Sequence, residues 1–369
     1  MDAREQLQQE AEARGFIVTW APVALPPEVK TRYKQWIING HQASMGQLIR
    51  AVDVRLAPDQ RLAWARSVMV LAAPHAFPDP GIPAGGVRIG RVGRLFWLRE
   101  QDYTRLLVEP HLEALKDLCY KLGGRCSDYI DQGPLPLRSY AANSGLGWIG
   151  RNGMLLNQQN GSYLTLAVLL TSFEVEPPPL YANRCGQCQL CVSSCPTKAL
   201  SGDGTLNANR CISYWTTQHR DLIPFEMWEG IGNWLYGCDI CQTVCPWNRK
   251  SEAFWREYRA EATLAHPDLT DFFLLSEVEL KQKYLRSAFE RSGRTHIARN
   301  ALIVLANTKD PAYLSLVRLG AEDQNPLIRA TSVWALLKLG DRQMATNLLK
   351  DPSEMVRREA QKALQLLAF

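Results

Sequence analysis

The sequence lacks any long apolar run and any apolar leader. No stretch approaches the roughly 18 consecutive apolar residues of a membrane-spanning helix, and residues 1–14 are charged and polar. These absences predict a cytoplasmic chain with no membrane span and with reduced thiols. A P-loop, an HExxH motif and a Ser-His-Asp order are also missing, which argues against P-loop nucleotide hydrolysis, zinc proteolysis and serine hydrolysis.

Cysteine, by contrast, is plentiful, and eight of the ten cysteines define one central region. The first run reads Cys185-x2-Cys188-x2-Cys191-x3-Cys195-Pro196, a spacing typical of bacterial ferredoxins. Two-residue gaps let one tight loop deliver three thiolates to a 4Fe-4S cluster, while the fourth cysteine reaches a neighbouring cluster. The run therefore predicts a second cluster.

A second run, Cys238-x2-Cys241-x3-Cys245-Pro246, is one ligand short because position 235 is Leu235. Cys211 is the candidate for the missing thiolate. If the last cysteine of each run crosses over, one site is Cys185, Cys188, Cys191 and Cys245, and the other is Cys195, Cys211, Cys238 and Cys241. A pair of structural zincs is the alternative, since paired C-x2-C also occurs in zinc ribbons.

Three domains are expected from the order of patterns along the chain. Apolar runs at 16–20, 68–73 and 163–170 predict strands, and helical patterns lie between them, so residues 1–175 are expected to form an α/β cofactor domain. Residues 176–252 hold the cysteines, which predicts a ferredoxin-like domain with two clusters. Residues 253–369 are helical in pattern.

A repeat marks the last domain. Arg299, Arg329 and Arg357 lie 30 and 28 residues apart, and each opens an Ala/Leu-rich helix. Stacked helical pairs of the HEAT type explain this period and predict a concave binding surface.

Positive charge is concentrated just before this repeat. Residues 281–299 carry six cations and one acidic residue, Glu290, a net charge of +5. The cations are Lys281, Lys283, Arg286, Arg291, Arg294 and Arg299. Such a run, with Tyr284 and Phe289 within it, is typical of nucleic-acid binding. A solvated helical face with some arginines packed internally explains it equally well.

Two motifs in the α/β domain bear on chemistry. Gly145-x-Gly147-x-x-Gly150 has the dinucleotide spacing, but no clear strand precedes it and no acidic partner lies about 20 residues on. We therefore expect these glycines to let backbone approach another large flat ligand, with Trp148 as a wall. Asp131 lies in the preceding loop, where burial beside a cofactor would raise its pKa and make it a proton donor. An Asx turn before Gly133-Pro134 is the alternative.

Taken together, the motifs resemble those of the epoxyqueuosine reductase family. They are Asp131-Gln-Gly-Pro, Gly145-Leu-Gly-Trp-Ile-Gly150-Arg-Asn, the first cysteine run, Arg210-Cys-Ile-Ser-Tyr and Gly237-Cys-Asp-Ile-Cys-Gln-Thr-Val-Cys-Pro-Trp-Asn248. The resemblance covers nearly the whole chain in order. It implies an oxidoreductase with two 4Fe-4S clusters and cobalamin, which reduces epoxyqueuosine to queuosine at the wobble position of tRNA. The Asp-x-His-x-x-Gly motif of other cobalamin proteins is absent, so the resemblance implies binding without that histidine.

The resemblance also implies roles for matched residues. Asp131 would donate the proton. The cobalamin pocket would draw on Arg55, Asp131, Gly147, Trp148, Gly150, Arg151, Ser213, Cys238 and Asp239, with Leu155 and Leu166 as apolar shelter. His219, Asp221 and the basic run 281–299 would meet the tRNA. Electrons would come from an external one-electron donor, and the chain is expected to be a monomer.

Two other functions fit parts of this pattern. A reductive dehalogenase-like corrinoid enzyme also joins cobalamin to two clusters, but it would have no use for a basic helical-repeat region. An electron-transfer or scaffold protein without its own substrate would use the repeats to dock other proteins.

Overall fold

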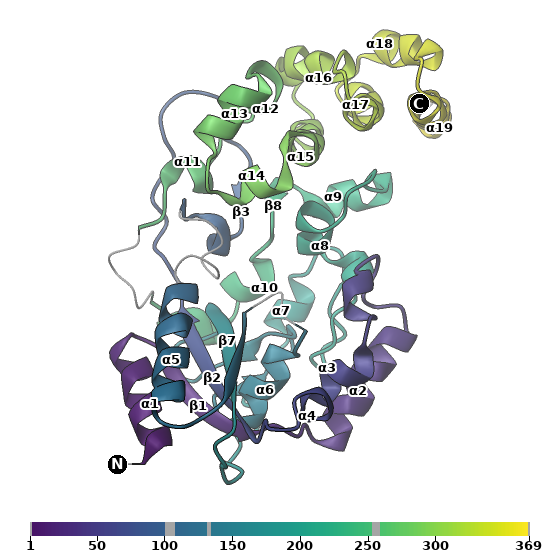
Figure 1. The fold of residues 1–369 in the computed structure, drawn as a ribbon. Helices are drawn as coiled ribbons and strands as arrows, with labels where there is room; N and C mark the ends of the chain where they lie inside the picture. Colours follow the sequence, from purple (N-terminus) through teal and green to yellow (C-terminus); the bar gives the residue numbers. More distant parts are fainter. Residues whose placement is uncertain (1, 100–107, 131–133, 253–258, 368–369) are drawn as a thin grey trace. The chain divides into compact units, whose positions relative to one another are not determined.

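The computed structural model describes residues 2–99, 108–130, 134–252 and 259–367 (Figure 1). The chain divides into two compact units, each assembled from three segments. The first comprises Met1–Pro78, Glu100–Asn209 and Asp239–Arg259, and the second comprises Asp79–Arg99, Arg210–Cys238 and Ala260–Phe369. The expected boundaries after residues 175 and 252 stay a prediction. Among the described residues, no helix is both long and apolar enough to cross a membrane.

A four-stranded antiparallel sheet in the order β1-β2-β7-β4 forms the centre of the first unit. Its strands are β1 (Ile17–Pro22), β2 (Ser67–Pro74), β4 (Cys126–Ile130) and β7 (Leu164–Thr171). Every residue of β2 and β7 is buried, because helices cover both faces of these inner strands. The three apolar runs thus form strands as predicted, whereas β4 carries no such run.

Helices pack on the two faces of this sheet. On one face lie α1 (Ala3–Ala13) and α5 (Glu109–Lys121), and on the other lies α6 (Leu137–Asn143) (Figure 1). Helix α1 begins with a capping box in which Asp2 and Glu5 satisfy each other's backbone N–H groups. On the α6 face, Tyr140 packs against Val70 and Val168 in one apolar cluster. An α/β architecture is therefore confirmed for the N-terminal region.

Short elements complete the first unit. They are α2 (Pro27–Ile38), α3 (Val52–Leu56), α4 (Pro58–Arg61), β5 (Trp148–Ile149), β6 (Leu155–Leu156), α7 (Leu190–Ser193) and α10 (Ile240–Thr243). Strands β5 and β6 pair as an antiparallel hairpin. Helices α7 and α10 follow the first cysteines of the two runs and pack against each other.

The second unit is mostly helical. Its elements are β3 (Arg91–Val92), α8 (Ile212–Thr217), α9 (Trp228–Ile231), β8 (Trp234–Tyr236), α11 (Ala262–Ala265), α12 (Asp271–Leu274), α13 (Glu277–Lys283), α14 (Ala288–Ser292), α15 (Arg294–Asn307), α16 (Leu314–Ala321), α17 (Pro326–Lys338), α18 (Arg342–Asn347) and α19 (Glu354–Leu366). Helices α15, α17 and α19 pack side by side, as stacked repeats require (Figure 1). The predicted helical repeat is confirmed.

Two of the repeat arginines form hydrogen bonds within their own repeats. Arg329 Nη1 donates to the carbonyls of Asp323 and Gln324 at 2.8 and 2.9 Å. Arg357 Nη1 donates in the same way to Asp351 and Pro352 at 2.7 and 2.8 Å. Each arginine thus satisfies the carbonyls of the loop that precedes its own helix. The period of the arginines in the sequence therefore reflects a hydrogen-bonding role that is repeated from one helix to the next.

The first repeat arginine, Arg299, is completely buried. Its guanidinium donates to the carbonyls of Trp215, His219 and Asp221 at 3.1, 3.0 and 2.6 Å, and to Asn300 Oδ1. Burial, together with the nearby Arg220, lowers the pKa of Arg299 to about 9, so it stays charged at pH 7. The expectation that Arg299 meets tRNA is therefore wrong for this fold, because the side chain is buried and its guanidinium donates to interior carbonyls.

We expect Arg299→Leu to lower the free energy of unfolding by on the order of 3 kcal/mol, because several buried carbonyls lose their donor. Urea unfolding followed by circular dichroism measures the change. Arg358→Leu, at an exposed position of α19, is the control and should change stability by no more than about 0.5 kcal/mol. Equal effects of the two substitutions would contradict the structural role.

Candidate functional site

The first cysteine run forms a tight loop in the first unit. Cys185 N donates to Asn183 Oδ1 at 2.9 Å, and Cys188 N donates to Cys185 O at 3.0 Å. Gly186, between them, has a φ of 53°, a left-handed conformation that glycine adopts without strain. Helix α7 then carries Cys191. The spacing thus produces the compact loop that the sequence predicted.

Cys245, which follows α10, joins the thiols of this loop. Burial raises the pKa of the Cys245 thiol, and the nearby thiols of Cys185 and Cys188 raise it further. Burial likewise raises the pKa of Cys191, with Cys245 and Cys185 as further causes. Cys185 also packs against the buried cluster that contains Cys245, so thiols of two separate segments are neighbours in the first unit. Thiols are the donor groups that a 4Fe-4S cluster requires.

Of the four cysteines predicted for the second site, Cys195 and Cys241 belong to the first unit, and Cys211 and Cys238 to the second. Cys195 Sγ accepts a hydrogen bond from Ala199 N at 3.3 Å, as a cluster-bound thiolate commonly does. Cys211 is the residue before the first turn of α8. Their assignment to a second cluster rests on the sequence spacing.

An apolar wall borders the first group of cysteines. Trp148, Leu156 and Cys245 form a buried cluster, and Cys185 and Trp247 pack against it. The rings of Trp148 and Trp247 meet edge to face with centroids 5.0 Å apart. Within the described part of the chain, Trp148 Nε1 is buried without a hydrogen-bond partner. The structure thus places Trp148 beside cysteines, and its role as the wall of a ligand site stays a prediction.

The glycines before and after Trp148 serve the β5–β6 hairpin. A Cβ on Gly147 would lie 2.0 Å from the Leu156 carbonyl oxygen, and one on Gly150 would lie 2.6 Å from Leu156 Cδ1. Both glycines therefore allow the two strands of the hairpin to approach closely. The expectation that they make room for a flat ligand needs correction, because hairpin atoms occupy the space on the side where their Cβ would point.

Arg151 fastens this hairpin to the cysteine loop. Its Nη2 donates to Gly186 O and its Nη1 to Gly202 O, both at 2.8 Å. Gly186 lies between Cys185 and Cys188, so the guanidinium holds the loop that carries the first cysteines.

The remaining pocket candidates are spread over both units. In the first unit, Arg55 is buried on α3 and donates through Nη2 to Gln47 O at 2.9 Å. Leu155 and Leu166 are buried in the apolar cluster under α6, where they serve as core residues. Asp239 Oδ1 accepts from Gln242 Nε2 at 3.2 Å. Ser213 and Cys238 belong to the second unit. Asp131 lies outside the described residues.

Two further polar side chains escaped prediction. His41 Nδ1 and Gln42 Oε1 are buried and have no hydrogen-bond partner in the part of the chain that the structure describes. Buried polar atoms are normally satisfied, so each such atom points to a partner supplied from elsewhere. No motif or charge pattern distinguishes these two residues in the sequence.

The basic run 281–299 divides into exposed and internal cations. Lys281, Lys283, Arg286 and Arg291 are exposed, although Lys283 Nζ also pairs with Asp271 at 2.7 Å. Arg294 is half-buried and pairs with Asp323, and Arg299 is buried. The internal arginines of the second interpretation are thus present, and tRNA binding by the exposed cations stays a prediction.

The aromatic and polar candidates near this run are mostly internal. Tyr284 and Phe289 are 2% and 3% exposed and pack on Phe272, so neither offers a surface for base stacking. Burial lowers the pKa of His219, whose Nε2 lies 2.9 Å from Leu222 O. Its ring is therefore neutral at pH 7. Asp221 is exposed.

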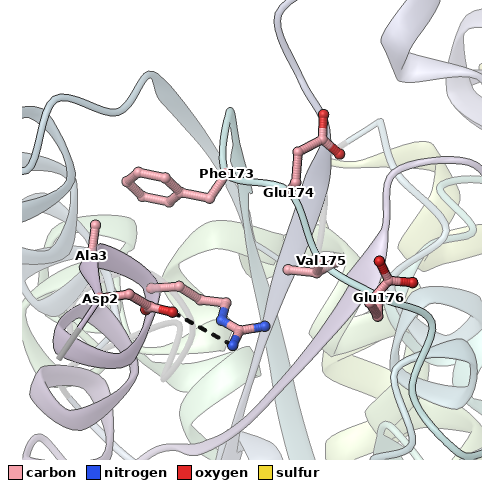
Figure 2. A pocket seen from close by; sticks show the side chains of 7 residues that line it. Asp2, Ala3, Phe173, Glu174, Val175 and Glu176 are labelled. Atoms are coloured by element: carbon pink, nitrogen blue, oxygen red, sulfur yellow. Dashed lines mark ion pairs between the residues drawn. The ribbon is translucent and has the colours of Figure 1, made fainter.

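A separate hollow of about 390 Å³ lies at the N-terminus of the first unit. Figure 2 shows it between the first turn of α1 and the segment after β7, with Arg4 paired to Asp2. Residues 2–4 and 173–176 line it, and none of the candidate site residues is among them. The hollow therefore does not belong to the candidate site.

The cysteine loop and the stacked helices define an iron–sulfur protein with a helical-repeat array, and comparison with known families agrees. The 4Fe-4S double cluster binding domain family matches residues 184–248, and the HEAT repeat family matches residues 283–365. The first match favours iron–sulfur clusters over the zinc alternative.

Similarity to individual proteins extends over most of the chain. The epoxyqueuosine reductase of Bacillus subtilis (strain 168) is 34% identical over 326 residues, covering 86% of this chain and 83% of the relative. That of Staphylococcus aureus is 33% identical over 317 residues, covering 84% and 81%. The chain belongs to the epoxyqueuosine reductase family and is an oxidoreductase.

Solved structures of the family match the whole fold. A crystal structure of epoxyqueuosine reductase with an epoxyqueuosine-modified tRNA-Tyr stem loop has a TM-score of 0.89 and 32% identity, covering 99% of each chain. The Bacillus subtilis enzyme, solved with its catalytic aspartate loop swung out of the active site, has a TM-score of 0.87 and 30% identity, covering 98% of each chain.

Substituting one cysteine of the first group should remove one cluster. We expect anaerobically reconstituted Cys245→Ala protein to hold about four irons, against about eight for the unaltered chain, because each cluster contains four. Iron analysis and electron paramagnetic resonance of the reduced protein measure the loss. Cys126→Ala is the control, since Cys126 lies in β4 outside both runs. Eight irons in Cys245→Ala would refute the ligand set.

Proposed function

We propose that this chain reduces the epoxide of epoxyqueuosine in tRNA, giving queuosine and water. Its similarity over 99% of its length to an epoxyqueuosine reductase solved with a modified tRNA stem loop carries the proposal. Family membership favours this reaction over the dehalogenase-like and scaffold alternatives. Removal of the epoxide oxygen as water consumes two electrons and two protons, so the protein must provide an electron path and a proton donor.

The thiols provide for the electron path. Cys185, Cys188, Cys191 and Cys245 converge in the first unit and fit a 4Fe-4S cluster. Cys195, Cys211, Cys238 and Cys241 are proposed for the second cluster on the spacing of the two runs. Because a 4Fe-4S cluster passes one electron at a time, an external one-electron donor has to act twice for each turnover.

Cobalamin is proposed as the group at which the epoxide is reduced. Its amide-rich periphery would supply partners for buried polar atoms such as Gln42 Oε1, His41 Nδ1 and Arg151 Nε, so these residues fit it. Arg55, a buried cation, would meet its negative charge. When bound, its reduced cobalt supplies the strong reductant that opens the epoxide. By family resemblance, Ser213, Cys238 and Asp239 are also proposed to contact it.

Asp131 is proposed to protonate the departing oxygen. The Bacillus subtilis enzyme has a catalytic aspartate loop that swings out of its active site, which supports a loop-borne carboxyl in this role. Burial beside the bound cofactor would raise the pKa of Asp131, so the protonated carboxyl would be present at neutral pH.

Asp131→Asn should retain both clusters and bound cobalamin and lose at least about 100-fold in turnover, because the amide cannot donate a carboxyl proton. Anaerobic conversion of epoxyqueuosine tRNA, followed by nucleoside analysis, measures the rate. Asp128→Asn, at a neighbouring carboxylate in β4, should keep most activity. Full activity of Asp131→Asn would remove Asp131 from the mechanism.

The exposed cations of the basic run are proposed to bind the tRNA backbone. Lys281 lies on α13, and Arg286 follows it in the loop before α14. Phosphate contacts from such residues release counterions, which makes the affinity depend on salt.

Reversing both charges, as Lys281→Glu with Arg286→Glu, should weaken tRNA binding on the order of ten-fold at low salt and reduce its salt dependence. Fluorescence anisotropy of a labelled anticodon stem loop measures both. Lys121→Glu, at an exposed cation of α5, serves as the control. An unchanged affinity of the double variant would show that the run is an ordinary solvated face.

A further inference from the structure

Two sequence ranges around the first cysteine run contain no acidic residue. The chain has 37 acidic residues among 369, about one in ten, yet none lies in 134–173 or in 177–202. The first range contains the β5–β6 hairpin and the second contains the first cysteine run. Both ranges carry cations, among them Arg151 and Arg184. The formal charge of these two ranges is therefore positive, while Asp239 lies on the neighbouring segment that carries Cys245.

The loop that carries these cysteines is exposed. Gly186, Gln187 and Gln189 lie at the surface, and Leu190 is 46% exposed. Cys185, Cys188 and Cys191 are themselves only partly buried. A cluster on these thiols would have one edge near solvent, and electron transfer is fast only across short distances. This loop is therefore the place where a donor can approach closely.

Arg184 lies at the rim of the same site. Its guanidinium is 5.2 Å from the ring centroid of Tyr181, which is 40% exposed. The Tyr181 ring lies 6.4 Å from that of Trp148, which packs against Cys245. A chain of contacts thus connects an exposed cation to the cysteine group. The cluster-side face is defined here as Tyr181, Arg184, Gln187, Gln189 and Leu190.

One acidic residue that borders this face, Asp203, forms an ion pair. Asp203 follows Gly202, whose Cβ position would lie 3.5 Å from Gln189 Oε1. Hydrogen bonds from Ser201 and Thr205, together with Arg32, lower the pKa of Asp203 to about 2 despite its partial burial. Its Oδ1 lies 3.8 Å from Arg32 Nη2. Asp203 is therefore ionised at pH 7, and Arg32 is the cation nearest to its carboxylate.

We propose that the cluster-side face is the docking surface for a small acidic electron-carrier protein of the flavodoxin or ferredoxin type. The inference rests on the proposed electron path, because it names the external donor that this path requires. The exposed Arg184 attracts an acidic partner, and exposed apolar groups such as Leu190 and Tyr181 make the short-lived contact typical of redox pairs. One electron leaves the carrier and one arrives at the cluster, with no bond made or broken.

Nucleic acid is the competing occupant of a positive surface. The exposed cations of the basic run, Lys281, Lys283, Arg286 and Arg291, crowd into eleven residues, a density suited to neighbouring phosphates. The cluster-side face has a single exposed cation, Arg184, and presents apolar and amide groups instead. Its composition favours a protein partner over a phosphate backbone.

The test combines charge removal with charge introduction in the full-length, cluster-loaded protein. Arg184→Gln removes the rim cation, and Gln187→Glu adds an acidic group of nearly the same shape to the exposed loop. Reduced flavodoxin is the probe, and dithionite is the small reductant for comparison. Stopped-flow bleaching of the cluster absorbance gives the rates, and calorimetric titration with oxidised flavodoxin gives the affinity.

We expect the double variant to lose about ten-fold in both flavodoxin rate and flavodoxin affinity at low salt, with the difference shrinking as salt screens the charges. Its dithionite rate should stay within about two-fold of the unaltered protein, and its tRNA affinity should not change. The Lys281→Glu and Arg286→Glu variant is the reciprocal control, which should keep its flavodoxin rate.

Unchanged flavodoxin rate and affinity in the Arg184→Gln and Gln187→Glu variant would overturn the docking surface. A loss of tRNA affinity in this variant would overturn it in favour of nucleic acid. Cluster bleaching and calorimetry do not involve epoxyqueuosine or cobalamin, so failure of the proposed reaction would leave both readouts intact.

Discussion

The convergence of four thiols from two distant segments is the constraint on which the first unit depends. Cys245 lies 60 residues after Cys185 in the sequence, and thiolates placed close together repel one another unless cations lie between them. Asn248 anchors the segment of Cys245. It donates to Ser162 Oγ at 2.9 Å and to Gln242 O at 2.7 Å, and accepts from Ser162 N at 2.6 Å. The end of α10 is thereby tied to the chain just before β7.

The β5–β6 hairpin connects the sheet to this cysteine group. The close approach of its two strands requires Gly147 and Gly150. Its first strand contributes Trp148 to the apolar wall. Arg151, just after this strand, donates a hydrogen bond to the cysteine loop. A spacing that resembles a dinucleotide motif thus has a structural cause unrelated to phosphate. Gly147 is needed because it meets the backbone of Leu156, and Gly150 is needed because it meets the Leu156 side chain.

Local features were predictable from the sequence, whereas long-range partners were not. The buried strands were predictable from apolar runs, and the cysteine loop was predictable from its spacing. Strand and loop formation both depend on residues that are neighbours in the sequence. The role of Arg299 was not predictable, since its carbonyl partners lie about 80 residues earlier in the chain. Gln42 was missed for a related reason: its buried oxygen becomes informative only once its surroundings are known.

The net charge of +5 conceals two different distributions. In the basic run of the second unit, positive charge comes from closely spaced lysines and arginines, of which Lys281, Lys283, Arg286 and Arg291 are exposed. Around the first cysteine run, it comes from the absence of acids in residues 134–173 and 177–202, where a few cations remain. Closely spaced cations suit a nucleic-acid backbone, which carries one negative charge on each phosphate. A sparse positive rim around exposed apolar groups suits a folded acidic protein that must bind and leave at each electron transfer.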